Sequence, residues 1–257
     1  MALKISVQAN APSPESLQLV RNSISIVSPE QASLAQWHKK YGSNHAVRLA
    51  HDLDILKRLV DRSKTVLEIG SVPLILTQAI ALSGYTLVGC DIAPERYAET
   101  LTRNSLNVVK CDIEHSRLPF EDNQFDAIVF NEIFEHLRIN LVFTLTEVLR
   151  VLKPGGTLML SSPNLRSLQG LINFLRHNRA FSCSADPFVE FKKLDTLGHM
   201  GHVREYTSTE ICAFLADIGF SVTELIYRGR YASPIRNSIT KVFPRLLPFI
   251  SYIATKR

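Results

Sequence analysis

The sequence predicts an α/β fold in which a mostly parallel sheet of seven strands carries helices on both faces. From Lys64 onward, short apolar runs alternate with segments of helical periodicity, which is typical of βαβ units. Polar residues follow the ends of four successive predicted strands, where open parallel sheets bind ligands. With 46% apolar residues over 257 positions, the chain can bury a sheet of this size.

The strands are predicted from short apolar runs bounded by turn residues. They are, in chain order, residues 65–70, 85–91, 106–112, 125–132, 157–162, 220–229 and 249–257. A polar loop separates the third strand from the fourth, and the turn sequence KPGG precedes the fifth. The intervening helices are predicted at residues 73–84, 94–104, 138–152, 164–176 and 206–220.

Each helix is supported by periodicity or by an end signal. Proline opens the first two helices, a position where its missing N–H is tolerated. In the third helix, Val142, Leu145 and Leu149 form an apolar stripe. Thr207 and Glu210 make a capping-box pattern at the start of the last helix.

Two regions depart from this alternation. Residues 1–60 lack strand signals and residues 28–60 have a helical pattern, so we expect a helical N-terminal cap on a domain formed by residues 61–257. Residues 163–205 contain one predicted helix followed by a stretch without a clean period. An insertion of this length suggests a lid that faces a substrate.

The cysteine content and the absence of long apolar segments indicate the cellular compartment of the protein. The four cysteines lie far apart and form no CxxC pair, so neither a disulfide framework nor a zinc ribbon is indicated. The N-terminus lacks an apolar signal segment, and no run of about 18 apolar residues follows. We therefore expect a cytoplasmic protein without a transmembrane segment.

The positive charge is concentrated at the C-terminus. Residues 221–257 hold seven basic side chains and one acidic side chain, a net charge of +6, whereas the whole chain has +5 and the remainder is therefore near −1. This basic tail is either a solvent-exposed edge that increases the solubility of the protein or a segment that makes weak contact with a membrane surface. Pro244 and Pro248 interrupt any long amphipathic helix there, and burial of the last strand explains most of its apolar residues.

Acidic residues close the predicted strands at regular intervals. Glu68 and Gly70 end the first strand, Asp91 the second and Asp112 the third. Asp91 follows Gly70 by 21 residues, close to the spacing of about 20 at which a carboxylate reaches ribose hydroxyls. Asp112 follows by another 21, where its carboxylate can accept a hydrogen bond from an adenine amino group.

Four stretches, in order and correctly spaced, resemble class I S-adenosylmethionine-dependent methyltransferases, which have a Rossmann-like fold. They are VLEIGS, GCDIAPERY, KCDIEHSRLPFEDNQFDAIVFNEIFEHL and EVLRVLKPGGTLMLSSPN. The resemblance implies S-adenosylmethionine as cofactor, with the methionine end near Glu68, Gly70 and Ser71. It implies that Asp91 holds the ribose. The remaining implied cofactor contacts are Ile92, Asp112, Ile113 and Asn131.

The glycine-rich turn of that family is incomplete, because Val72 and Leu74 occupy its second and third glycine positions. A dinucleotide pyrophosphate needs glycine there, whereas S-adenosylmethionine carries no phosphate. The departure therefore argues more strongly against an NAD(P)-dependent oxidoreductase than against a methyltransferase. A non-catalytic or binding-impaired relative stays open. Since Val72 precedes Pro73, we do not expect a left-handed turn.

Glu132, Glu135 and His136 are spaced so that a helix would place them on one face, an arrangement suited to a divalent metal. A similar pattern occurs in ubiquinone-pathway and small-RNA 2′-O-methyltransferases, and in the latter a further histidine completes the metal site. His202 is its counterpart, and His199 lies close by. The candidate site for Mg²⁺ or another divalent metal therefore consists of Glu132, Glu135, His136 and His202.

Without metal, His136 or His202 is the candidate general base, because imidazole titrates near neutrality. We expect O-methylation of a small molecule, a sugar or a glycolipid, while nitrogen and carbon acceptors stay open. We expect no DNA partner, and no aromatic and basic platform for single-stranded RNA is evident.

Overall fold

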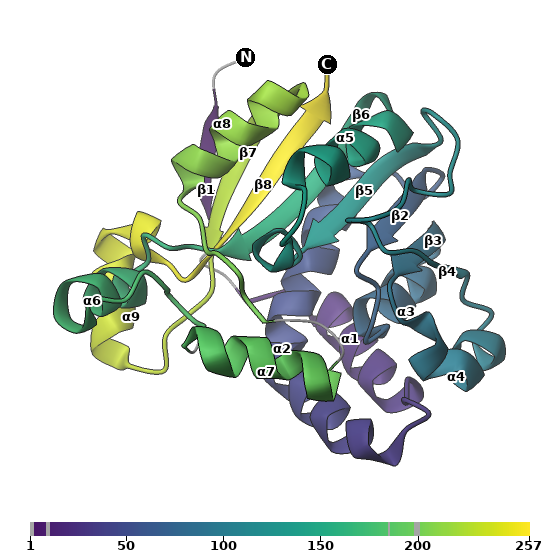
Figure 1. Cartoon of the computed structure of the whole chain (residues 1–257), viewed down its shortest axis with the longest axis horizontal. Helices are drawn as coiled ribbons and strands as arrows, with labels where there is room; N and C mark the ends of the chain where they lie inside the picture. The colour runs from purple at the N-terminus through teal and green to yellow at the C-terminus, as the bar shows by residue number, and fades with distance from the viewer. Residues whose placement is uncertain (1–2, 9–10, 185, 198–200) are drawn as a thin grey trace. The chain divides into compact units, whose positions relative to one another are not determined.

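The structure is a computed structural model that describes residues 3–8, 11–184, 186–197 and 201–257 (Figure 1). The described strands form one sheet and helices lie between them in the chain, in agreement with the predicted α/β fold class. The strands are β1 (Lys4–Val7), β2 (Thr65–Ile69), β3 (Thr86–Asp91), β4 (Val108–Lys110), β5 (Phe125–Asn131), β6 (Leu152–Pro163), β7 (Phe220–Arg228) and β8 (Phe249–Lys256).

The strand order is β1-β7-β8-β6-β5-β2-β3-β4. Strands β2, β3, β4 and β5 pair in parallel, as does β1 with β7, whereas β7 and β8 are antiparallel. Because the carboxyl ends of parallel strands fall at the same edge of a sheet, this pairing brings the polar ends of β2, β3, β4 and β5 to one edge. The mostly parallel sheet is confirmed.

The described part of the sheet has eight strands rather than the predicted seven. The additional strand is β1, in the region for which we expected only helices. It pairs with β7 from Lys4 opposite Glu224 to Val7 opposite Tyr227, and a 3.1 Å ion pair joins Lys4 to Glu224. Four residues, three of them exposed, are too few to give a periodic signal.

The helices largely follow the prediction. They are α1 (Pro14–Ile26), α2 (Ala32–Leu59), α3 (Ile75–Leu82), α4 (Ala98–Arg103), α5 (Leu141–Val151), α6 (Leu168–His177), α7 (Pro187–Leu197), α8 (Ser208–Ile218) and α9 (Pro234–Val242), with short 3-10 helices η1 (Pro94–Tyr97), η2 (Phe134–His136) and η3 (Pro244–Leu246). Helix α7 lies in the stretch for which no period was evident.

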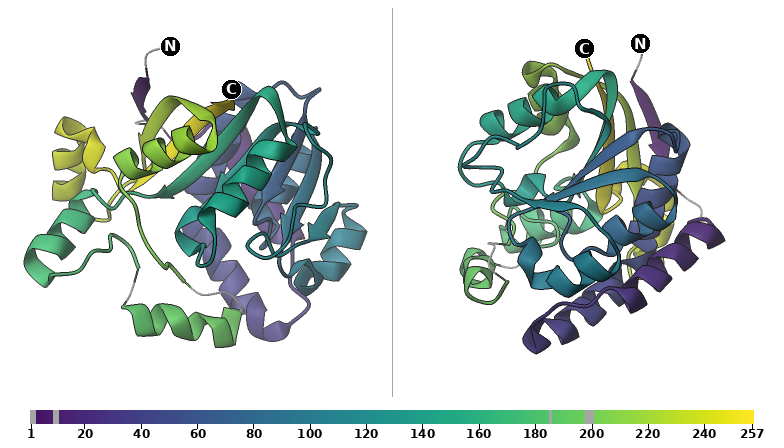
Figure 2. Two further views of the ribbon diagram at one scale, coloured as in Figure 1. Left: turned by 45° about the horizontal axis from the view of Figure 1, so that its top comes forward. Right: turned by 90° about the vertical axis from the view of Figure 1, so that its right-hand side faces the viewer.

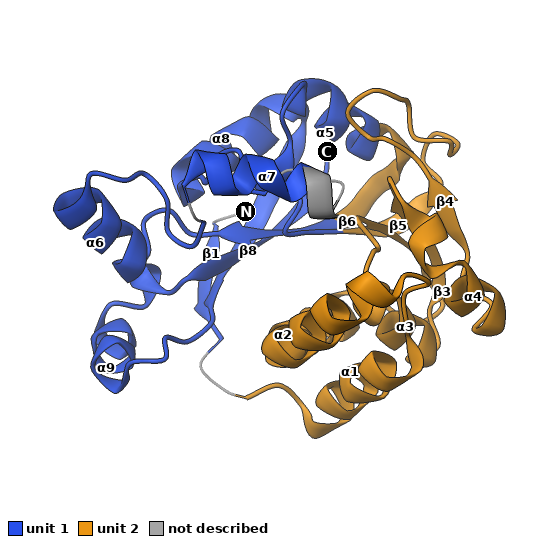
Figure 3. Cartoon of the chain, turned by 60° about the horizontal axis from the view of Figure 1, so that its bottom comes forward, with its two compact units in different colours: residues 1–9, 130–149, 158–257 blue, residues 10–129, 150–157 orange. Residues whose placement is uncertain are grey.

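The described chain divides into two compact units (Figure 3). Unit 1 comprises Met1–Ala9, Phe130–Leu149 and Leu158–Arg257, and unit 2 comprises Asn10–Val129 and Arg150–Thr157. In unit 2, the N-terminal helices α1 and α2 pack side by side (Figure 2), and both contact α3. This packing fits the expectation of helices at the N-terminus, but the proposed boundary at residue 60 stays a prediction.

In unit 1, the structure tests the capping box that the sequence predicts at the start of α8. The Thr207 hydroxyl accepts from the Glu210 N–H and the Glu210 carboxylate accepts from the Thr207 N–H, so the capping box of α8 is confirmed. Gly219 ends the helix with φ 120°. Among the described helices of the chain, none is long and apolar enough to cross a membrane. All four cysteines are free thiols.

Candidate active site

The loop after β2 in unit 2 is held against the end of β3. The backbone N–H groups of Gly70 and Ser71 both donate to the Cys90 carbonyl, at 2.8 and 3.2 Å. The Ser71 hydroxyl accepts from the Cys90 N–H at 3.1 Å and donates to the Glu68 carbonyl at 3.0 Å. Gly70 has φ 76°, a left-handed conformation that favours glycine.

A second left-handed residue follows at Leu74, with φ 63°, so our expectation of no left-handed turn was wrong. The rule for residues before proline constrains Val72, whereas the turn lies just after Pro73, whose peptide bond with Val72 is cis. The Leu74 side chain is fully buried against Val27 and Tyr97, and Val72 packs against the same cluster. The residues that replace two glycines therefore point into the core of unit 2.

We expect Leu74→Gly to lower the free energy of unfolding by about 2 kcal/mol, measured by urea denaturation. Loss of a buried leucine side chain costs about 3 kcal/mol, and relief of the left-handed backbone returns about 1 kcal/mol. Leu74→Ala is the matched control, since it removes the side chain without relieving the backbone. The alanine variant should be the less stable of the two, and the reverse order would contradict a left-handed residue at this position.

Asp91, the last residue of β3, organises this edge. Its Oδ2 accepts from the Val72 N–H and its Oδ1 from the Ala93 N–H, both at 2.9 Å. The carboxylate thus links the β2–α3 loop to the turn after β3. The adjacent Ile92 is 45% exposed, which leaves an apolar side chain available to cover a flat ligand.

Asp112 follows β4 and is held locally. Its carboxylate accepts from the Glu114 N–H at 3.0 Å and contacts the His115 ring at 2.9 Å. Burial raises the pKa of Asp112, but these hydrogen bonds outweigh it and leave the pKa below its usual value. Ile113, next in the chain, is half-buried. Hence Asp112 is ionised, and it already has hydrogen-bond donors.

Glu68 is a buried carboxyl near the end of β2 in unit 2. Its side chain is only 4% exposed, and among the described residues its Oε2 has no hydrogen-bond partner. Burial, together with the nearby carboxylates of Asp91 and Asp52, raises the pKa of Glu68 to about 8. Asp52, on α2, was not identified from the sequence because no spacing relates it to the strand ends.

In unit 1, Asn131 is the last residue of β5. Both polar atoms of its side chain are shielded from solvent, and neither has a hydrogen-bond partner within the described chain. Glu132, the next residue, has φ 56°. Its N–H donates to the Ser161 carbonyl at 2.9 Å and its carboxylate accepts from the Ser161 hydroxyl at 2.7 Å.

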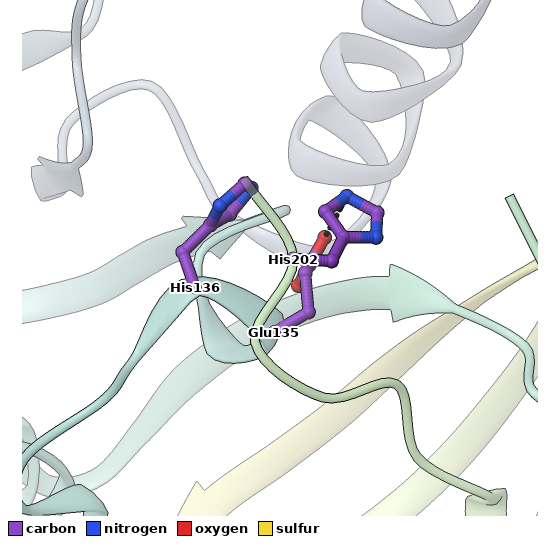
Figure 4. Close-up of side chains that lie close together, drawn as sticks. All are labelled: Glu135, His136 and His202. Atoms are coloured by element: carbon purple, nitrogen blue, oxygen red, sulfur yellow. Dashed lines mark ion pairs between the residues drawn. The ribbon is translucent and has the colours of Figure 1, made fainter. Parts of the chain in front are cut away.

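The predicted helix face with Glu132, Glu135 and His136 was wrong. Residues Phe134–His136 form only the short helix η2. Glu132, which precedes η2, is itself left-handed, so its side chain points toward β6. Its Oε1 lies 3.9 Å from the Arg228 guanidinium. The cluster that does form contains Glu135, His136 and His202, whose nearest ligand atoms all lie within 4.8 Å of one another (Figure 4). Three of the four predicted metal ligands are therefore close together.

His202 is fixed through its backbone as well as its ring. Its N–H donates to the Glu190 carboxylate of α7 at 3.0 Å, and the next N–H, that of Val203, donates to the Glu135 carbonyl at 2.8 Å. Its Nε2 lies 3.9 Å from the Glu135 carboxylate, and its ring meets that of His136 edge to face at 4.9 Å between centroids. His199 lies outside the described residues.

Glu205, which the sequence analysis missed, sets the tautomer of His202. It is 1% exposed, and its carboxylate accepts from the Ser182, Cys183 and Ser184 N–H groups. Burial raises its pKa, but the hydrogen bonds from His202 and Ser182 lower the pKa of Glu205 to about 2.

An ionised carboxylate only accepts hydrogen bonds, so the His202 Nδ1, 3.1 Å from Glu205, carries a proton. In the neutral ring the Nε2 lone pair therefore lies on the side of Glu135. Cys183 lies beside this pair, with its Sγ 3.5 Å from Glu205 Oε1. Burial and the surrounding carboxylates hold the Cys183 pKa above its usual range, so it is a thiol rather than a nucleophilic thiolate.

Comparisons with known proteins agree with this organisation. Residues 67–160 match a protein-family model described as "Methyltransferase domain". The bifunctional methionine biosynthesis protein MetXA/MetW of Rhodopirellula baltica is 30% identical over 96 residues, which are 37% of this chain. The matched region spans only 15% of the length of that relative.

Two solved structures share the fold. One is a chain of the complex that contains the Haloferax volcanii Trm112 methyltransferase activator, with 17% identity and a TM-score of 0.58 over 89% of this chain and 99% of that chain. The other is an S-adenosylmethionine-dependent methyltransferase of Methanosarcina mazei, with 20% identity and a TM-score of 0.56 over 79% of this chain and 96% of that chain. The chain therefore has the Rossmann-like fold of class I methyltransferases, and its residues 67–160 are similar to the methyltransferase-domain model.

Proposed function

We propose that this chain transfers a methyl group from S-adenosylmethionine to an acceptor. The observation that carries the proposal is the edge formed in unit 2 by the ends of β2, β3 and β4. There Glu68 lies next to the last residue of β2 and Asp91 is the last residue of the neighbouring parallel strand β3. A hydrogen bond joins the Val72 N–H of the loop after β2 to Asp91. This edge lies within the region that matches the methyltransferase domain.

Each residue of this edge has a role in the proposal. Asp91 accepts hydrogen bonds from the ribose hydroxyls, and the apolar side chains of Ile92 and Ile113 cover the adenine, whose amino group faces Asp112. Gly70 and Ser71 supply the loop at the methionine end, together with Glu68. The Asn131 amide, which has no hydrogen-bond partner among the described residues, is a suitable donor and acceptor for the amino-acid part of the cofactor.

The chemical step requires little from the protein. The sulfonium methyl is already activated, so in-line positioning supplies much of the rate and a base removes one proton. His202 is the candidate base, since Glu205 holds its Nδ1 proton and leaves Nε2 to accept a proton from the acceptor. This is the orienting role that a carboxylate plays in a catalytic triad. His136 is the alternative base.

The acceptor in this proposal is an oxygen of a small molecule, a sugar or a glycolipid. A hydroxyl acceptor loses its proton on methylation, which gives the His202 and Glu205 pair its function. The titratable pair therefore favours oxygen, whereas an uncharged amine or a carbanion acceptor has less need of a base.

A divalent metal is the second candidate function of the same cluster. The Glu135, His136 and His202 ligand atoms supply one oxygen and two nitrogens within 4.8 Å, a combination that divalent metals accept. The bond from His202 to Glu205 matches the carboxylate–histidine pattern that orients metal-bound imidazole. Activity should fall on EDTA treatment and return with Mg²⁺ or Mn²⁺ if this candidate holds, and activity unaffected by EDTA would retire it.

Calorimetry with S-adenosylhomocysteine tests the function. We expect saturable binding that Asp91→Ala weakens about 100-fold, because the variant loses both the ribose acceptor and the Val72 link, each worth about 1 to 2 kcal/mol. Asp61→Ala, at the amino-terminal side of β2 in the same unit, should bind as the wild type does. No binding by the wild type at millimolar ligand would overturn the proposal, provided that circular dichroism shows a folded chain.

A further inference from the structure

Two helices of unit 1 expose large apolar side chains to solvent. On α6 the exposed residues are Phe174 and Leu175, at 60% and 81%. On α9 and just after it they are Ile235, Ile239, Val242 and Phe243, at 74%, 37%, 71% and 61%. Their spacing on α9 repeats at four, three and one residues, so they form one stripe along a helix that is apolar on its outer side.

Helices α6 and α9 lie side by side in the views of Figures 1 and 2, and polar contacts join them. The Arg236 guanidinium on α9 donates to the Gln169 side chain on α6, and the Gln169 N–H donates to the Tyr231 hydroxyl at 3.5 Å. The Tyr231 hydroxyl in turn donates to the Leu246 carbonyl at 2.8 Å. We call the exposed side chains of these two helices and of η3 the α6–α9 surface.

The α6–α9 surface is strongly basic. Residues 161–185 contain three arginines and residues 225–257 contain seven basic side chains, and neither stretch contains an aspartate or a glutamate. Four of these basic residues are exposed on or beside the two helices, namely Arg176, Arg179, Lys241 and Arg245. Exposed apolar groups therefore alternate with cations and have no acidic group of their own to neutralise them.

We propose that the α6–α9 surface docks on an anionic lipid bilayer. Short helices with an apolar stripe and basic flanks lie in the headgroup region, where the stripe reaches the acyl boundary and the cations meet lipid phosphates. A second copy of the chain is disfavoured as the occupant, because it would place two surfaces of the same charge together. This arrangement differs from a simple basic tail, since α6 contributes Phe174, Leu175 and Arg176 to it.

Docking by itself does not depend on the proposed methyl transfer. Joined to it, docking selects among the proposed acceptors, because an enzyme that rests on a bilayer meets lipid-linked molecules first. The α6–α9 surface therefore favours a glycolipid acceptor, and this preference for an acceptor, unlike the docking, rests on the proposed function.

Sedimentation with vesicles tests the docking. The full chain should sediment with vesicles of phosphatidylglycerol and phosphatidylcholine and stay in solution with pure phosphatidylcholine. The double variant Lys241→Glu/Arg245→Glu should weaken partitioning at least 25-fold, since each basic residue near an anionic surface contributes about fivefold. Val242→Ser/Phe243→Ser should also weaken it, and higher salt should weaken binding by the wild type.

Matched controls separate this surface from general stickiness. Lys40→Glu, on α2 of unit 2, and Val142→Ser, a 57% exposed valine on α5, should bind vesicles as the wild type does. Equal loss in the controls, equal binding to neutral vesicles, or a lipid-free dimer that Val242→Ser/Phe243→Ser dissolves would overturn the proposal. Calorimetry with S-adenosylhomocysteine on the same samples shows separately whether the cofactor proposal stands.

Discussion

Replacing His202 with alanine is expected to lower kcat by roughly 100-fold to 10,000-fold, the range that general base catalysis supplies, while S-adenosylhomocysteine binds as before. The structural reason is the tautomer. Glu205 fixes the proton on Nδ1, so only Nε2 can take the acceptor proton, and alanine removes it. The ring centroid of His136 lies 4.9 Å from that of His202. His136→Ala should lower kcat by a smaller factor.

Glu205→Gln tests the same chemistry through the residue that orients the proposed base, His202. We expect kcat to fall about tenfold to 100-fold, as for other carboxylates that orient a functional histidine, with little change in KM for the cofactor. Cys183→Ser is the matched control, since Cys183 also lies beside Glu205 and His202 but has no role in the proposed step. Full activity in His202→Ala would refute the assignment and leave His136 as the base.

Local sequence signals predicted most of the fold because they act over a few residues. The Thr207 capping box and the Gly219 stop mark the two ends of α8 with residues that adjoin the helix. Strand β1 escaped detection since its four residues gain their structure by pairing with β7, more than 200 residues away. Helix α7 is similar, because the Glu190 contacts to the loop that carries His202 anchor it.

The candidate site shows the same limit. The spacing of Asp91 after Gly70 correctly placed both at one edge of parallel strands. In contrast, the metal prediction assumed a helix through Glu132, and one left-handed residue at that position removed its side chain from the cluster. Glu205 was missed because its importance comes from the Ser182–Ser184 backbone folding onto it, which no local pattern encodes.

Glu68 makes the stability of the protein depend on pH. Burial and the neighbouring Asp91 and Asp52 carboxylates raise its pKa from 4.5 to about 8 in the folded chain. The folded state therefore binds a proton more tightly than the unfolded state does. Proton binding by Glu68 therefore contributes its full share to the free energy of unfolding below about pH 4.5. This contribution is lost as the pH rises to about 8, and the free energy of unfolding falls by about 5 kcal/mol in total.

Glu68→Gln should abolish this dependence, because glutamine keeps the shape of the protonated carboxyl and does not titrate. We expect urea denaturation to give similar free energies of unfolding near pH 4.5, and the variant to become the more stable protein above it, by up to about 5 kcal/mol near pH 8. Glu99→Gln, an exposed glutamate on α4, should follow the wild type throughout. A parallel pH profile for wild type and Glu68→Gln would show that the buried carboxyl is already ionised. Since the ammonium group of its homocysteine end favours the ionised Glu68 carboxylate, S-adenosylhomocysteine should narrow the difference in stability at pH 8.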